Sequence, residues 1–143
     1  PFTEAEQQQT ECSMSTVQKY VLPCLRGSWP RNCVIIPLTK DDDGRKIEAH
    51  REDIEIWGQL VDKNKLFDHY KETYKGTANG MIKDASVFWR YLRADQGEFG
   101  CNLSFGKNQQ PKVYNKNEQC IQFPTLEEAK KQFLELCRNG FVI

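Results

Sequence analysis

Two short helical patterns, separated by a tight turn, constrain the fold of this chain more than any other feature. The first stretch is "KLFDHYKETYKG", whose apolar residues recur at helical spacing on one face: Leu66, Phe67, Tyr70 and Tyr74. Gly76 can end this helix because glycine adopts the left-handed conformation without steric penalty. The next stretch, "TANG", predicts a turn, since an Asn-Gly pair accepts positive φ angles. A second helix after so short a connection indicates a helix-turn-helix pair.

The second stretch, "DASVFWRYLRAD", is both aromatic and basic. Asp84 is placed to cap the helix, and Ala85, Phe88 and Leu92 form one stripe that we expect to face the core. Helical geometry then turns four side chains toward solvent: Ser86, Trp89, Arg90 and Arg93. Tyr91 lies at the border between the two faces. This outward face is the candidate binding surface of the chain.

The segment after the second helix reads as extended chain. "EFGCNLSFGKNQQPKVYNKNEQCIQF" contains two or three strand-like pieces, with a polar tip predicted at Gly106 to Pro111 and a further turn at "NKNE". A helix-turn-helix pair followed by a β-hairpin is the order of a winged helix, an α+β fold. In that fold the second helix of the pair lies in the DNA major groove, and the hairpin contacts the backbone.

The last helix is marked by its first residues. Thr125 and Glu128 follow Pro124 with the spacing of a capping box, and Gly140 is placed to end the helix. The predicted buried stripe comprises Leu126, Ala129, Phe133, Leu136 and Cys137.

The N-terminal third predicts three further pieces. Residues 1–13 are polar and Gln-rich, which is typical of a flexible lead-in. A helix follows in "SMSTVQKYVLPCLRG", capped by Ser13 or Ser15 and stopped by Gly27, and Pro23 predicts a kink or an early end. "CVIIPL" predicts a buried strand, "DDDGRK" a turn, and "KIEAH" an extended partner. We therefore divide the chain into the lead-in, an N-terminal helix and hairpin-like segment at 14–55, and a winged helix at 56–143.

Composition narrows the class of protein further. The 143 residues suit one domain, and no apolar run approaches the roughly 20 residues that span a bilayer. The N-terminus lacks the apolar stretch of a signal peptide, so we expect an intracellular protein, cytoplasmic or nuclear, without a membrane partner. The six cysteines lack the spacing of a zinc site. Their apolar settings favour buried free thiols over three disulfides.

Charge is uneven along the chain although the total is zero. Residues 57–116 hold 10 Lys and Arg against 6 Asp and Glu, a net +4. Residues 1–56 hold 7 against 10, a net −3, and residues 117–143 hold 3 against 4, a net −1. The middle segment is therefore the one place where a polyanion is favoured.

These residues resemble a known family. The run "LFDHYKETYKG…SVFWRYLRAD…CIQFPTLEEAKKQF" is similar to the C-terminal region of primase–helicases of the poxvirus and phage type, in which a superfamily 3 ATPase is followed by a small winged-helix module. The resemblance covers most of residues 56–138 and, more loosely, 15–29. Lys130 stands where the pattern often has Arg, and residues 30–53 form an insertion. The matching residues are Leu66, Tyr70, Phe88, Trp89, Leu92, Arg93, Phe123, Pro124, Leu126, Glu127, Glu128 and Phe133.

The resemblance implies a nucleic-acid-binding module that assists DNA engagement at replication sites. Its expected partner is duplex or forked DNA, with the helicase domain of its own parent protein or a replication partner as further possibilities. Arg suits both phosphate and guanine because its planar guanidinium donates in pairs. The candidate nucleic-acid-binding residues are Lys83, Ser86, Trp89, Arg90, Arg93, Lys107 and Lys112.

Two other interpretations stay open. In the first, Arg90 and Arg93 are solvated surface groups and Trp89 caps the core. In the second, the chain is a protein-interaction module that docks on an ATPase ring or a replication partner. In that second case the anchors are Trp29, Trp57 and Trp89.

Enzymatic chemistry has little support in the residues. The chain has no G-x-x-x-x-G-K-[ST] motif, so we expect no nucleotide hydrolysis, no catalytic residue and no cofactor. The Asp41–Asp43 run followed by glycine predicts a solvated turn and not a metal site. His50 and His69 lie apart from any nucleophile, and we interpret them as structural or surface residues.

Overall fold

The computed structural model describes residues 3–36, 43–44, 50–76, 80–109, 119–137 and 140–143. Within them the chain is α+β, with an antiparallel sheet in the strand order β2-β1-β3-β5-β4. The strands are β1 (Val34–Ile36), β2 (His50–Glu52), β3 (Leu60–Asp62), β4 (Asn108–Gln109) and β5 (Cys120–Gln122). The helices are α1 (Glu4–Ser13), α2 (Thr16–Leu25), α3 (Lys63–Thr73), α4 (Ala85–Leu92), the 3-10 helix η1 (Ala94–Phe99) and α5 (Leu126–Leu134).

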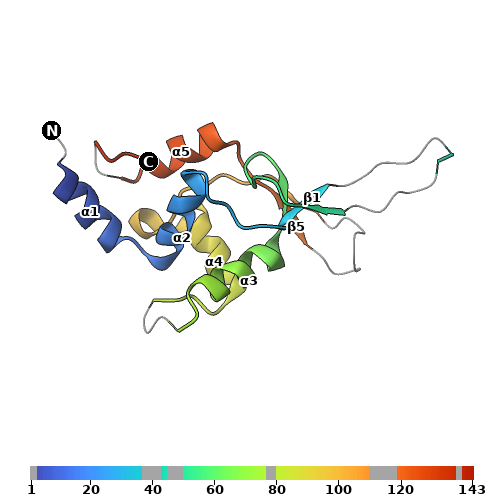
Figure 1. Ribbon diagram of the computed structural model, residues 1–143, viewed down its shortest axis with the longest axis horizontal. Helices are drawn as coiled ribbons and strands as arrows, with labels where there is room; N and C mark the ends of the chain where they lie inside the picture. Colours follow the sequence, from blue (N-terminus) through green and yellow to red (C-terminus); the bar gives the residue numbers. More distant parts are fainter. Residues whose placement is uncertain (1–2, 37–42, 45–49, 77–79, 110–118, 138–139) are drawn as a thin grey trace.

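Helix α2 lies at the centre of the helical part. It packs against both α4 and α5, and Figure 1 shows α5 on one side of it and the α3–α4 pair on the other. Val17 and Leu25 of α2 share one apolar core with Tyr70, Phe88 and Phe133. This core joins residues on both sides of the division expected near residue 55.

Local signals placed several helix ends correctly. Ser15 caps α2 in a capping box with Gln18, and Asp84 caps α4. Thr125 caps α5, because its side chain accepts a hydrogen bond from the backbone N–H of Glu128. Pro23 stands inside α2, so the expected early end is wrong. Its carbonyl oxygen accepts the backbone N–H groups of Arg26 and Ser28, at 3.0 and 2.9 Å, which closes the end of the helix.

The polar lead-in expected at residues 1–13 contains a helix in the part that the structure describes. Glu4–Ser13 form helix α1, capped by the side chain of Thr3. The helix buries no residue and is held by polar contacts with distant parts of the chain. Glu11 pairs with Arg26 at 2.7 Å, and the Gln7 side-chain amide bonds both the N–H and the carbonyl of Val142. Composition alone does not reveal the anchor at Val142, because it lies 135 residues from Gln7 in the sequence.

Other expectations hold in part. The strand in "CVIIPL" pairs with an extended partner, as expected, but β2 is His50–Glu52, and most of "KIEAH" lies outside the described residues. All six cysteines are free, as expected; four are buried, Cys137 is half-buried and Cys12 is exposed. Leu136 lies beyond α5 and is exposed, so its place in the buried stripe is wrong.

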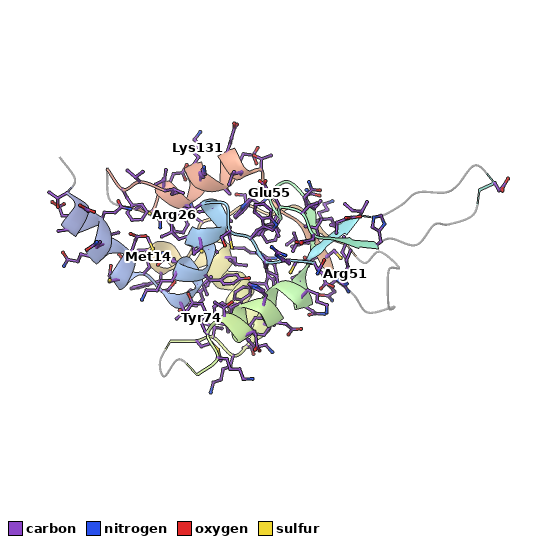
Figure 2. All side chains as sticks on the ribbon, viewed as in Figure 1. Met14, Arg26, Arg51, Glu55, Tyr74 and Lys131 are labelled. Carbon is purple, nitrogen blue, oxygen red and sulfur yellow. The ribbon has the colours of Figure 1, made fainter. Side chains whose placement is uncertain are left out.

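A buried carboxylate joins strand β2 to the start of helix α3. Asp62 is 1% exposed at the end of β3, and its Oδ1 accepts the backbone N–H groups of Asn64 and Lys65 at 2.9 and 3.1 Å. Its Oδ2 accepts a hydrogen bond from Arg51 of β2 at 2.5 Å (Figure 2). One side chain therefore caps α3 and neutralises a half-buried cation, as the geometry of a charge-assisted hydrogen bond favours.

We expect Asp62→Ala to lower the free energy of unfolding by about 3 kcal/mol, because the change leaves a partly buried Arg51 without this carboxylate and α3 without its cap. Urea unfolding followed by circular dichroism measures the loss. Asp68→Ala, which removes an exposed carboxylate, is the matched control and should change stability by less than about 0.5 kcal/mol. Equal stability of the two variants would contradict the structural role of Asp62.

Candidate nucleic-acid interface

Helix α4 begins at a fully formed cap. Asp84 Oδ1 accepts the backbone N–H groups of Ser86 and Val87 at 2.8 and 3.3 Å, and the Ser86 hydroxyl at 2.6 Å. The Ser86 hydroxyl is the first of the causes that lower the pKa of Asp84, followed by these two N–H groups, and the charge of Arg90 is a smaller contribution. The hydroxyl of Ser86 therefore donates within the cap, and only its lone pairs remain for another partner.

The position of α4 depends on Tyr70. The fully buried Tyr70 hydroxyl lies 2.7 Å from Thr16 Oγ1 of α2 and accepts the Ile82 N–H at 2.9 Å. Thr16 Oγ1 in turn donates to the Gly80 carbonyl at 2.6 Å. These bonds hold residues 80–82, which lead into α4, against α2 and α3.

The inward face of α4 differs from the expected stripe. Phe88 and Leu92 are buried, as expected, but Ala85 is exposed and Trp89 is 5% exposed, so the outward direction predicted for Trp89 is wrong. The Trp89 ring packs edge-on against Phe105 and Phe123, with ring centroids 5.7 and 6.2 Å apart. These two residues follow α4 in the chain and bury Trp89. The helical spacing of apolar residues in α4 alone does not predict this contact.

The outward face of α4 carries the remaining candidates. Lys83, Ser86 and Arg90 are exposed, and Arg93, at the C-cap, is half-exposed. Within the described part of the chain, neither Arg90 nor Arg93 forms an ion pair with a carboxylate. The two guanidinium groups are thus available for an anion, whereas Trp89 is not.

The hairpin residues are only partly described. Gly106 N–H donates to the Gln122 carbonyl at 3.0 Å, and a Cβ at Gly106 would lie 2.9 Å from Gln122 Cβ. Gly106 therefore belongs to the base of the hairpin, and Asn108 and Gln109 form β4 and pair with β5. The tip expected at Gly106 to Pro111 is thus wrong over its described residues, 106–109. Lys107 is exposed just before β4. Lys112 lies outside the described residues.

Lys63 is a basic residue of this region that the sequence patterns did not single out. It opens α3, directly after Asp62, and its Nζ lies 5.1 Å from the centroid of the Trp89 ring. Burial lowers the pKa of Lys63, and the charge of Arg93 lowers it further. The only signal in the sequence is a lysine after a cap residue, because its approach to Trp89 depends on how α3 and α4 pack.

Few aromatic rings are exposed in the part of the chain that the structure describes. Phe99 is the only exposed aromatic side chain among the described residues. It lines a 370 Å³ cavity with Met14 and Leu136, between the start of α2 and the end of α5. Trp57 is buried and Trp29 is half-buried, so two of the three tryptophan anchors considered for a protein partner, Trp57 and Trp89, are covered.

Other site types have no support in the described residues. No group of His, Cys, Asp and Glu within them is arranged to hold a metal ion. His69 Nδ1 lies 2.9 Å from the Tyr20 hydroxyl, and burial lowers the pKa of His69, which fits the structural role expected for it. None of the helices found there is long and apolar enough to cross a membrane.

Comparisons of the chain with known protein families, curated proteins and solved structures find no match.

We expect Trp89→Ala to lower the free energy of unfolding by about 3–5 kcal/mol, because the change opens a cavity against Phe105 and Phe123. Arg90→Ala, at the neighbouring exposed position, is the control and should change it by less than about 0.5 kcal/mol. Urea unfolding followed by far-ultraviolet circular dichroism distinguishes the two. If Trp89→Ala were as stable as Arg90→Ala, the inward packing of Trp89 would be refuted.

Proposed function

We propose that the chain is a winged-helix module that binds duplex or forked DNA through α4, as part of a viral or mobile-element replicative primase–helicase. The observation that carries the proposal is the connectivity of α2, β3, α3, α4, β4 and β5. A winged helix has this order of three helices and three strands, with the first strand paired to the last.

Strand pairing supports this assignment. β3 and β4 both pair with β5 and flank it, in the order β3-β5-β4, so the hairpin returns beside the strand that precedes α3. In this arrangement α3 and α4 are the helix-turn-helix pair, and α4 is the helix placed for the major groove. The β1–β2 hairpin, which extends the sheet beyond β3, is then an insertion between α2 and β3.

Charge on α4 supports DNA as the ligand. Arg90 and Arg93 face away from the core without a carboxylate partner in the described part, and Lys83 precedes the helix. Guanidinium groups bind phosphate oxygens and guanine edges in pairs of hydrogen bonds. Exposed cations of this kind stay hydrated when the protein is free, and their binding to DNA is favoured by the release of counterions from the DNA.

The buried state of Trp89 favours a duplex over a single strand. Proteins that prefer single strands stack unpaired bases on exposed aromatic rings. Phe99, the one exposed ring in the described residues, lies beside the start of α2, where its carbonyl accepts the Ser15 hydroxyl, and not on α4. Phosphate and groove contacts are therefore the interactions that this surface offers.

We expect the double variant Arg90→Ala with Arg93→Ala to bind a 20-base-pair duplex at least about fivefold more weakly, because two phosphate or base contacts are lost. Fluorescence anisotropy at about 50 and 200 mM salt measures the affinity and its salt dependence. The wild-type affinity should fall steeply with salt, and the slope should be shallower in the variant.

The matched control for this experiment is Lys130→Ala with Lys131→Ala. It removes the same charge from α5, which lies across α2 from α4, with Lys131 on its outer side (Figures 1 and 2). The control should bind like the wild type. Unchanged binding by the arginine variant, or an equal loss in both variants, would exclude α4 as the specific contact surface.

A further inference from the structure

Lys63 of α3 and Arg93 of α4 each make a contact with Trp89. Lys63 is the first residue of α3, and its backbone N–H donates to the Gln119 carbonyl at 3.0 Å, beside the start of β5. Arg93 is the C-cap of α4, and its backbone N–H donates to the Trp89 carbonyl at 3.3 Å. Backbone bonds therefore hold Lys63 at the start of α3, and they hold Arg93 one helical turn after Trp89.

The Trp89 ring gives Lys63 a defined position. The ammonium group lies over the ring at 5.1 Å, a distance at which a cation is attracted by the ring face. The ring is itself held by Phe105 and Phe123. Lysine loses side-chain entropy when it binds an anion, and a side chain already held against a ring loses less.

The proximity of two cations costs free energy unless an anion joins them. The charge of Arg93 contributes to the lowered pKa of Lys63, after the larger effect of burial, so the two groups repel across this site. Among the residues that the structure describes, no carboxylate forms an ion pair with either one. By contrast, the partly buried Arg51 lies against Asp62.

We propose that Lys63 and Arg93 together bind one phosphate of the DNA backbone, which fixes the position of α4 along the duplex. The proposal rests on the proposed function, because it assumes that α4 is the helix that faces the DNA.

The chemistry of the two groups fits a phosphodiester. The Arg93 guanidinium can donate two parallel hydrogen bonds to two phosphate oxygens, while Lys63 supplies a compact charge from the neighbouring helix. Contacts to phosphate carry no sequence information, but they set the register and the orientation of a protein on the duplex. A phosphate held from both α3 and α4 would set the position at which Arg90 and Lys83 meet the groove.

The test compares Lys63→Gln with Lys63→Arg and Lys65→Gln in binding to two 20-base-pair duplexes of unrelated sequence. Lys65 is exposed on the same helix, where it lines a cavity with Arg31 and His69. We expect Lys63→Gln to weaken binding about three- to tenfold, equally on both sequences, and to reduce the slope of log affinity against log salt by about 1. Lys63→Arg and Lys65→Gln should bind within about twofold of the wild type, because each keeps both charges of the pair.

A double-mutant cycle tests whether the two residues share one phosphate. The loss in Lys63→Gln with Arg93→Ala should be smaller than the product of the two single losses, because each single change already disrupts the same contact. If the affinity loss of the double variant equals the product of the two single losses, the two contacts are independent and the shared site is overturned.

The failure of the phosphate site is separable from the failure of the proposed function. If the wild type binds duplex through Arg90 but Lys63→Gln binds equally well, the shared phosphate is refuted while the proposed function stands. If the wild type does not bind duplex at low salt, both are refuted. Unfolding curves for each variant separate a loss of binding from a loss of the fold, and recovery by Lys63→Arg rules out a merely structural effect of the Gln change.

Discussion

The packing of Trp89 against Phe105 and Phe123 sets the rotation of α4, and the candidate interface depends on that rotation. With Phe88, Trp89 and Leu92 all buried, the inward face of this helix is wide. Arg90 is then left exposed on the opposite side, with Arg93 at the edge. The same ring contacts the base of the hairpin and supports Lys63 of α3, so one side chain links α3, α4 and the hairpin, the parts that carry the proposed DNA contacts.

Two polar side chains hold these parts in place. Tyr70 is fully buried and connects α2, α3 and the chain leading into α4 through its hydroxyl. Asp62 joins β3 to α3 and, through Arg51, to β2. Buried polar groups whose hydrogen bonds are satisfied tend to specify one arrangement over its alternatives, because other packings would leave them unpaired. The hydrogen bonds of Tyr70 and Asp62 therefore hold these elements in place without a contribution from the exposed cations of α4.

Local features were predictable from the sequence, whereas contacts between distant segments were not. Caps such as Ser15, Asp84 and Thr125 depend on residues two or three positions away, so their letters suffice. The burial of Trp89 and the approach of Lys63 depend on Phe105, Phe123 and the crossing of two helices, which no periodicity contains. Helix α1 shows the same limit, since its anchor at Val142 is remote in sequence. Among the candidate contact residues, Arg90 and Lys83 face solvent as expected, and Trp89 does not.

The proposed DNA-binding surface is tested most directly by mapping it residue by residue. Amide chemical shifts of the isotope-labelled chain, recorded as a short duplex is added, report which backbone groups sense the ligand. If α4 binds the duplex, the largest shift changes fall on residues 83–93 and at Lys63, with little change along α1 and α5. Changes concentrated on α5, or around Phe99 and Leu136, with α4 unaffected, would contradict it.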